Sequence, residues 1–302
     1  MPIHLPALSR REFLAGSLAA GGYWLSRGLV QAADDPAATS HWALFSDTHI
    51  PPSSDVAFRG VNMSAHLEQA IRAVLDEPVR PAGVLVDGDC AFLAGQAADY
   101  AHLVELLKPL RQAGLPVHLA LGNHDHRERF WEALPPDAQA VQPVADRHVS
   151  IVPAGWANFF LLDSLDVTNQ TPGLLGEAQL VWLAAALDLH HDKPAIVLGH
   201  HHPARVSQIS GLKDTAALFD VLLPRRHVKA YIFGHTHHWA VRAEEGLHLV
   251  NLPPTAYPFN DRDPSGWVGL VLGADGATLR LHAIDPSHPD HGQEVQLDWR
   301  AG

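Results

Sequence analysis

The chain has 302 residues, of which 47% are hydrophobic and 18% are charged, and its formal net charge is −12 at neutral pH. This balance is typical of a globular protein with enough apolar residues for a sizeable core, and the acidic character argues against nucleic acid as a partner. Histidine is unusually frequent, with 22 copies, which indicates metal binding or proton transfer.

Residues 1–32 have the features of an export signal. Arg10 and Arg11 precede a short, glycine-rich apolar stretch, and the small residues up to Ala32 suit cleavage by a signal peptidase. The pattern resembles a twin-arginine signal, which predicts recognition by the twin-arginine (Tat) export machinery and a periplasmic or extracellular location. The apolar stretch is too short and too interrupted to span a membrane stably, so we expect a soluble exported protein.

Apolar, strand-like segments alternate with amphipathic helical stretches through the rest of the chain. After a polar spacer at 33–40 we expect one domain over 41–302, and the alternation indicates an α/β fold. Helices are expected at 62–77, 99–114, 176–190 and 215–224. Pro109 should bend or shorten the second of them. The domain is expected to end in a hairpin that turns at Asp275 and Gly276.

Five apolar strands end in the same way, with aspartate, asparagine or histidine at the carboxyl end. These ends read SDTH at 46–49, GDC at 88–90, GNHD at 122–125, GHHH at 199–202 and GHTH at 234–237. Sites in open α/β sheets assemble at the carboxyl ends of strands, so the polar side chains are expected to converge. The alternation of side chains along a strand predicts that Asp47 and His49 point the same way, as do His235 and His237. The adjacent glycines allow sharp turns and close packing.

Carboxylate, carboxamide and imidazole groups together form a mixed oxygen and nitrogen donor set. Such a set suits manganese, iron, zinc or cobalt better than calcium or magnesium. Seven donors are too many for one catalytic ion, but they fit two ions ~3.5–4 Å apart that share a carboxylate. The candidate donors are Asp47, His49, Asp89, Asn123, His200, His235 and His237. Cys90, the only cysteine, is expected to be a small buried residue.

The five motifs, in this order, resemble the signature blocks of the calcineurin-like metallophosphoesterases over residues 41–255. The region around GNHDHR and the segment from LLDSLD to GLLGEAQLVWLAAAL are similar in particular to the class III cyclic-nucleotide phosphodiesterase branch. The resemblance implies a four-layer α-β-β-α sandwich of two mixed sheets flanked by helices. It does not extend to the purple acid phosphatases, because Phe92 stands where that branch has a metal-binding tyrosine.

The resemblance also implies a role for each block. One divalent or trivalent ion would be bound by Asp47, His49, Asp89 and His237, and the other by Asp89, Asn123, His200 and His235. His124 would protonate the leaving oxygen or stabilise the transition state, and Asp125 would orient His124. A hydroxide that bridges the two ions would attack phosphorus in line, without a covalent enzyme intermediate.

The implied activity is hydrolysis of a small-molecule phosphoester, and its finer class stays open. The branch resemblance favours a phosphodiesterase, whereas export favours a phosphomonoesterase that acts on external esters. A metal-binding protein that has lost catalysis is a third reading, and an exported scaffold protein without metal is a fourth.

The residues that would contact the substrate are less clearly marked. His201 and Arg127 are candidates for binding phosphate, although Arg127 could equally be a solvated surface residue. Asn62 could face the cleft, but it also suits a helix cap. The aromatic residues Tyr257, Phe259 and Trp267 could line a substrate pocket or pack into the core.

Overall fold

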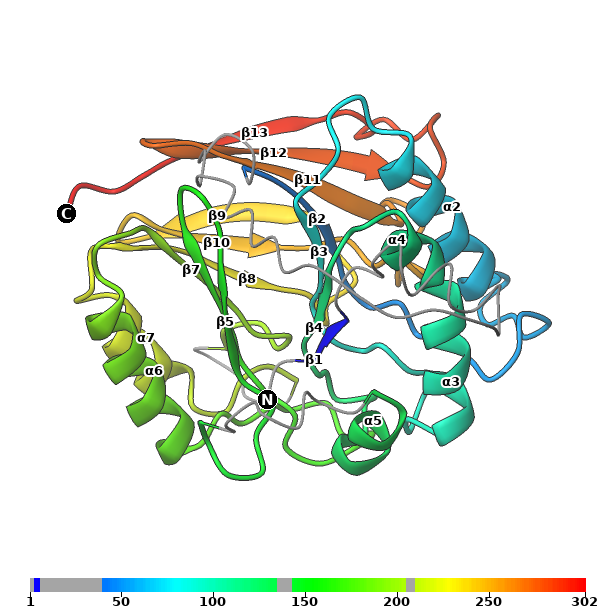
Figure 1. Ribbon diagram of the computed structural model, residues 1–302, viewed down its shortest axis with the longest axis horizontal. Coiled ribbons are helices and arrows are strands. Elements are labelled where there is room, and N and C mark those ends of the chain that lie inside the picture. Colours follow the sequence, from blue (N-terminus) through cyan, green and yellow to red (C-terminus); the bar gives the residue numbers. More distant parts are fainter. Residues whose placement is uncertain (1–2, 6–39, 135–142, 205–209) are drawn as a thin grey trace, which may run out of the picture.

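Two β-sheets pack face to face in the computed structural model, and helices cover the outer face of each sheet (Figure 1). The structure describes residues 3–5, 40–134, 143–204 and 210–302. The four layers confirm the predicted α-β-β-α sandwich. Apart from residues 3–5, the predicted export signal at 1–32 lies outside the described residues and stays a prediction.

The first sheet has seven strands within the described residues. Their order is β1 (Ile3–Leu5), β4 (Val117–Leu119), β3 (Gly83–Val86), β2 (His41–Phe45), β11 (Gly266–Leu272), β12 (Gly276–Ala283) and β13 (Glu294–Asp298). Strands β2, β3 and β4 are parallel, and the others join antiparallel. Strands β11 and β12 form the expected hairpin, which turns at 273–275, but the chain then continues into β13 and does not end there.

The second sheet has six strands in the same described part of the chain. Their order is β5 (Ser150–Pro153), β6 (Asn158–Leu161), β7 (Ala195–Leu198), β8 (Val228–Phe233), β10 (Leu247–Asn251) and β9 (Ala240–Glu244). The four inner strands are parallel, and β5 and β9 form antiparallel edges. The inner strands are mostly apolar because both of their faces are covered.

Six helices in the described residues cover the sheets. Helices α2 (Met63–Leu75), α3 (Ala97–Leu106), α4 (Lys108–Gln112) and α5 (Arg127–Ala133) lie on the first sheet, and α6 (Glu177–Leu189) and α7 (Thr215–Leu222) lie on the second. The predicted break near Pro109 is confirmed, because α3 ends before it and Pro109 lies in the first turn of α4, where a missing N–H is tolerated. None of these helices is long and apolar enough to cross a membrane.

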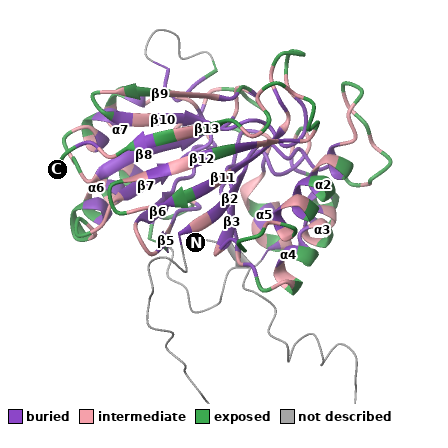
Figure 2. Cartoon of the chain, turned by 90° about the horizontal axis from the view of Figure 1, so that it is seen from above, coloured by how far each residue is buried: buried purple, intermediate pink, exposed green. Residues whose placement is uncertain are grey.

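The core between the sheets brings β2 against β6. The Trp42 ring packs edge-on against Phe159, with ring centroids 5.0 Å apart, and Leu44 joins the same apolar cluster. On the outer face of the first sheet, α2 buries Leu67 and Ile71. The inner strands are accordingly buried along most of their length, and exposed residues gather on the helices, the loops and the edge strands β9 and β13 (Figure 2).

The carboxyl ends of the parallel strands of both sheets meet along one edge. The Asp47 N–H donates to the Gly88 carbonyl at 3.1 Å, which joins the ends of β2 and β3. The Gly234 N–H donates to the His200 carbonyl at 3.1 Å, which joins the ends of β8 and β7. The Thr255 N–H donates to the Ser46 carbonyl at 2.8 Å and links the loop after β10 to the first sheet. The predicted convergence of strand ends is therefore confirmed.

Candidate dinuclear metal site

A first group of buried ligand atoms lies beyond the ends of β2 and β8. The Nε2 atom of His237 is 3.2 Å from Oδ1 of Asp47 and 3.1 Å from Nε2 of His49. His49 Nε2 is also 3.9 Å from the same Asp47 oxygen. The three side chains are at least 98% buried, and they form a group that could hold one cation.

A second group lies beside the first, beyond the ends of β3, β7 and β8. Its members are Asp89, His200 and His235. The Oδ2 atom of Asp89 is 3.2 Å from His200 Nε2 and 3.8 Å from His49 Nε2. Asp89 therefore lies between the two groups, which is the position required of a carboxylate that bridges two ions.

The polar atoms at this site fit a pair of cations. Asp47 Oδ1, Asn123 Oδ1 and His200 Nε2 are buried and have no hydrogen-bond partner among the described residues. A buried polar atom without a partner destabilises the fold by ~1–3 kcal/mol. Three such atoms at one site therefore indicate that a ligand binds them in the native protein. Oxygen and imidazole nitrogen donors together suit a divalent transition metal.

The backbone at the strand ends is left-handed. β2 ends at Phe45 and β8 at Phe233, so the pairs Asp47–His49 and His235–His237 lie past the strands. The prediction that strand alternation orients each pair is therefore wrong. Five of the candidate ligands have positive φ angles: Asp47 (51°), His49 (45°), Asp89 (46°), His235 (67°) and His237 (53°). Non-glycine residues rarely adopt such angles, and they persist at functional sites that the surrounding structure holds in place.

Glycines allow the two sheets to approach closely at this edge. A β-carbon on Gly234 would lie 1.9 Å from Ser46 Oγ and 2.4 Å from Asp47 Oδ2. A β-carbon on Gly122 would lie 2.2 Å from Asp89 Oδ1. The predicted role of these glycines in close packing is confirmed.

Backbone carbonyls orient two of the imidazoles. The His200 ring contacts the Asp87 carbonyl through Nδ1 at 2.8 Å, and the His237 ring contacts the Tyr257 carbonyl through Nδ1 at 2.5 Å. Each Nδ1 therefore carries the proton, and each Nε2 is left to act as a ligand.

Burial keeps two of the other histidines neutral. Burial lowers the pKa of His49 to about 3 and that of His235 to about 3, so both imidazoles are uncharged at neutral pH and able to bind a metal. Burial acts to raise the pKa of Asp47, but His237 and His200 outweigh it and hold that pKa well below its usual range. The site thus combines an ionised Asp47 with neutral imidazoles at His49 and His235. At His200, burial acts to lower the pKa, but Asp89 and Asp47 outweigh it and raise the pKa to about 10, so a metal ion that binds His200 Nε2 has to displace a proton.

The predicted contact between Asp125 and His124 is wrong. The His124 ring contacts the Leu93 carbonyl through Nδ1 at 2.5 Å. The Asp125 carboxylate is buried elsewhere, where it accepts hydrogen bonds from the N–H groups of Gly122, Cys90 and Ala91 and from the Tyr100 hydroxyl. Asp125 therefore holds the loops after β3 and β4 together. His124 itself lies beside His49 and Asp89, in a position to act on a bound substrate.

The three candidate substrate-binding residues all have other contacts. Both oxygens of Asp163 accept from Arg127, at 2.6 and 2.9 Å, so Arg127 has a structural role. Asn62 caps α2, because its Oδ1 accepts from the Ala65 N–H at 2.9 Å. His201 is fully buried behind the site, and its Nδ1 lies 2.8 Å from Ser164 Oγ.

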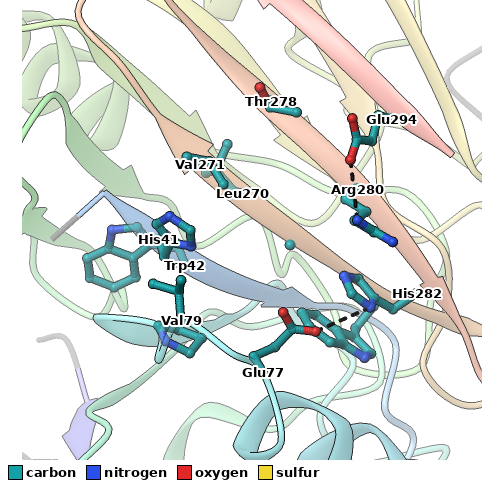
Figure 3. A pocket seen from close by; sticks show the side chains of 13 residues that line it. His41, Trp42, Glu77, Val79, Leu270, Val271, Thr278, Arg280, His282 and Glu294 are labelled. Carbon is teal, nitrogen blue, oxygen red and sulfur yellow. Dashed lines mark hydrogen bonds and ion pairs between the residues drawn. The ribbon is translucent and has the colours of Figure 1, made fainter. Parts of the chain in front are cut away.

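A cavity of about 500 Å³ opens over the candidate ligands. Tyr257 and Phe259 line it, which confirms the pocket alternative for these two residues. The third aromatic candidate, Trp267, lies in a different cavity of about 200 Å³ on the first sheet, where it stacks on His282. Figure 3 shows this cavity, with His282 beside Arg280 and Glu77. Cys90 is buried and free, as expected.

The cavity is also lined by residues that the sequence did not single out. They include Phe58, Arg59, Leu93, Thr171 and Ser210. These positions lie in loops between the strand-end motifs, so no local pattern marks them. Phe92, in place of a metal-binding tyrosine, packs edge-on against Phe58 with ring centroids 5.4 Å apart.

The sequence of the chain is similar to a known family and to named enzymes. Residues 41–239 match the family model described as calcineurin-like phosphoesterase. The chain is 29% identical over 243 residues to the 3′,5′-cyclic adenosine monophosphate phosphodiesterase CpdA of Pseudomonas aeruginosa, covering 76% of this chain and 85% of that protein. It is 27% identical to a cAMP/cGMP dual specificity phosphodiesterase of Mycobacterium tuberculosis, covering 82% and 76% of the two chains.

The fold is shared with solved structures of lower sequence identity. A dimetal phosphatase from Danio rerio superposes with a TM-score of 0.68 at 16% identity, over 87% of this chain and 99% of that one. A purple acid phosphatase from yellow lupin superposes with a TM-score of 0.63 at 13% identity, over 86% of this chain and 53% of that one. With the family match and two groups of ligand atoms that meet at Asp89, the chain belongs to the calcineurin-like phosphoesterase family and is a metal-dependent phosphoester hydrolase with a dinuclear site for divalent metal ions.

Proposed function

We propose that the protein is a phosphodiesterase of small nucleotides, with a 3′,5′-cyclic nucleotide as the first candidate substrate. The observation that carries this proposal is the position of Asp89 between two groups of buried imidazoles. The names of the similar enzymes support the substrate class. The cavity of about 500 Å³ falls within the range of small-molecule sites.

The assignment of ligands follows from the two groups. We assign Asp47, His49, Asp89 and His237 to one ion and Asp89, Asn123, His200 and His235 to the other. Manganese, iron, zinc and cobalt are the candidate metals, because all accept oxygen and imidazole donors. When bound, such a pair activates water at neutral pH and neutralises the charge of a phosphoryl group.

His124 is the proposed general acid. Its Nδ1 donates to the Leu93 carbonyl, so the ring has to enter the reaction as the imidazolium, in which Nε2 carries the second proton and donates it to the leaving oxygen. The side chain lines the cavity beside the two metal groups. The His124 N–H also donates to Asp89 Oδ1 at 2.8 Å, which ties the acid to the bridging carboxylate.

The test is metal analysis of the purified protein together with a substrate panel. We expect two metal equivalents per chain, and faster turnover of 3′,5′-cyclic AMP and bis(p-nitrophenyl) phosphate than of p-nitrophenyl phosphate. Preference for the monoester would replace the proposal with a phosphatase. Two bound metals with no turnover of any phosphoester would instead identify a metal-binding protein without catalysis.

We also propose that the protein is exported by the twin-arginine pathway and is periplasmic or extracellular. The support is the Arg10–Arg11 pair before a short apolar stretch. Cell fractionation of wild type and of a variant with both arginines changed to lysine would test this. Retention of the variant in the cytoplasm is expected, and equal distribution of the two proteins would refute it.

A further inference from the structure

A permanently positive side chain, Arg59, lines the cavity over the metal site. Among the described residues that line it, Arg59 is the only lysine or arginine. The chain as a whole carries a formal charge of −12, and such a protein repels an anionic substrate. A fixed cation at the cavity is therefore well placed to attract and hold a phosphoester.

Aromatic rings hold the Arg59 guanidinium in place. Its Cζ atom lies 5.4 Å from the centroid of Phe259, 5.7 Å from that of Phe58 and 5.9 Å from that of Tyr257. These contacts are in the range of cation–π interactions. The side chain makes no hydrogen bond or ion pair with any described residue, so its N–H donors are available to a ligand.

The backbone at Arg59 is unfavourable for an arginine. Phe58 and Val61 exchange two backbone hydrogen bonds of 2.9 Å, which makes Arg59 and Gly60 a two-residue hairpin turn. Their φ angles are 51° and 78°, as a type I′ turn requires, and such turns favour asparagine followed by glycine. An arginine in this strained conformation, with its charge at a functional cavity, indicates a role beyond the turn.

The turn is connected to the metal site through one aromatic ring. Phe259 stacks on the candidate ligand His237 with ring centroids 4.0 Å apart and an interplanar angle of 6°. Arg59 lies over the Phe259 ring. Arg59, Phe259 and His237 therefore line the same cavity and are in contact one after the other.

We propose that Arg59 binds phosphoryl oxygens of the substrate and is the main side chain that sets the affinity for anionic substrates. This inference rests on the proposed function of the same site. Guanidinium binds phosphate through two parallel hydrogen bonds, which neutral imidazoles cannot provide. The phosphoryl group bound by Arg59 is either the one that reacts or a second phosphate of the same substrate.

The test compares three variants of the metal-loaded, full-length protein: Arg59→Asn, Arg59→Lys and Arg72→Gln. Asparagine suits the turn, so the melting temperature of Arg59→Asn should equal or exceed that of wild type, which separates binding from misfolding. Loss of a charge-assisted hydrogen bond should raise KM about tenfold or more, with kcat changed less than about twofold. Lysine should restore part of the affinity. Arg72, an exposed residue of α2 that pairs with Glu68, is the matched charge control and should leave KM unchanged.

Two substrates identify which phosphoryl group is bound. If KM rises for bis(p-nitrophenyl) phosphate, which has one phosphoryl group, Arg59 binds the reacting phosphate. If KM rises only for a nucleoside diphosphate ester, Arg59 binds the second one. In either case the dependence of log KM on log salt concentration should be weaker in Arg59→Asn than in wild type.

Binding of inorganic phosphate, measured by calorimetry, does not depend on turnover. A protein that hydrolyses nothing but binds phosphate about tenfold more tightly than Arg59→Asn would refute the proposed function and keep this inference. A protein that hydrolyses phosphodiesters with the same KM and phosphate affinity in all variants would refute the inference alone. Loss of metal in Arg59→Asn would also overturn it, because Arg59 would then only support Phe259 and His237.

Discussion

The Nε2 atoms of His49 and His237 face each other at 3.1 Å, and Asp47 Oδ1 lies 3.2 Å from the second of them. At most one proton can be shared between two nitrogens, whereas a single cation can be bound by all three atoms. The arrangement is therefore more stable with a metal ion than without one.

Removal of the metal ions should lower the stability of the fold. We expect a chelator to reduce the melting temperature by at least about 5 °C, since ions at a hundredfold excess over Kd stabilise a fold by about 2.7 kcal/mol. Addition of manganese or zinc should restore it. Scanning calorimetry with parallel metal analysis checks this, and an unchanged melting temperature in the metal-free protein would contradict it.

Asp89→Asn should disrupt both metal positions. The amide cannot provide two anionic oxygens to two ions, so we expect loss of metal and a fall in kcat/KM of about a thousandfold. Asp87→Asn is the matched control. Burial raises the pKa of Asp87 to about 8, against a lowering by His200, so the group is neutral at pH 7, as an amide is. An equal loss of bound metal and of kcat/KM in the two variants would argue against a bridging role for Asp89.

His124→Ala should slow turnover while both metals stay bound. Loss of a general acid lowers kcat by about 10²–10⁴-fold, and His124 lies outside the two sets of ligands assigned here. The control is His126→Ala, two residues further along the chain, where the side chain pairs with Glu128 instead. Steady-state kinetics with metal analysis checks both variants. Loss of metal from His124→Ala would show that the residue is a ligand.

The sequence predicted the parts of the site that depend on strand ends. Apolar runs followed by short polar motifs are local patterns, and parallel strands necessarily bring their carboxyl ends to one edge. Asp47, Asp89 and His237 were therefore found without the structure. Strand alternation was the wrong basis for the orientation of Asp47 and His49, because their left-handed backbone past the strand cannot be predicted from a period-two pattern.

The substrate-facing residues could not be predicted in the same way. Arg59 reaches the cavity through a two-residue turn, and Phe259 through the loop after β10. Their positions depend on how loops from distant parts of the chain pack against one another. The partners of Arg127 and Asp125 were missed for the same reason, since each lies more than 20 residues away from its carboxylate or hydroxyl partner.

Gly234→Ala should destabilise the site directly. The added β-carbon would lie 1.9 Å from Ser46 Oγ and 2.4 Å from Asp47 Oδ2, so the ends of β2 and β8 would have to separate. Overpacking of this kind lowers the free energy of unfolding by about 1–3 kcal/mol, and metal affinity should fall with it. Gly273→Ala is the control, since its β-carbon would meet only Gly276 O at 3.5 Å. Denaturant unfolding should distinguish the two, and equal stabilities would contradict the close packing.

The free energy of unfolding should decrease below pH 6.5 because of His282, which lies outside the metal site. His282 stacks on Trp267 with ring centroids 3.9 Å apart, and burial, followed by Arg280 and His291, lowers its pKa from 6.5 to about 4. Between these two pH values the unfolded chain therefore binds a proton that the folded chain does not. This contribution to stability is complete above pH 6.5 and is lost as the pH falls towards 4.

His282→Phe keeps an aromatic ring without the titration, so its melting temperature should decrease less between pH 7 and 5 than that of wild type. Thr278→Val, on the same strand and in the same cavity, should keep the wild-type pH dependence. Identical pH profiles for His282→Phe and wild type would show that the imidazole is not held neutral by its surroundings.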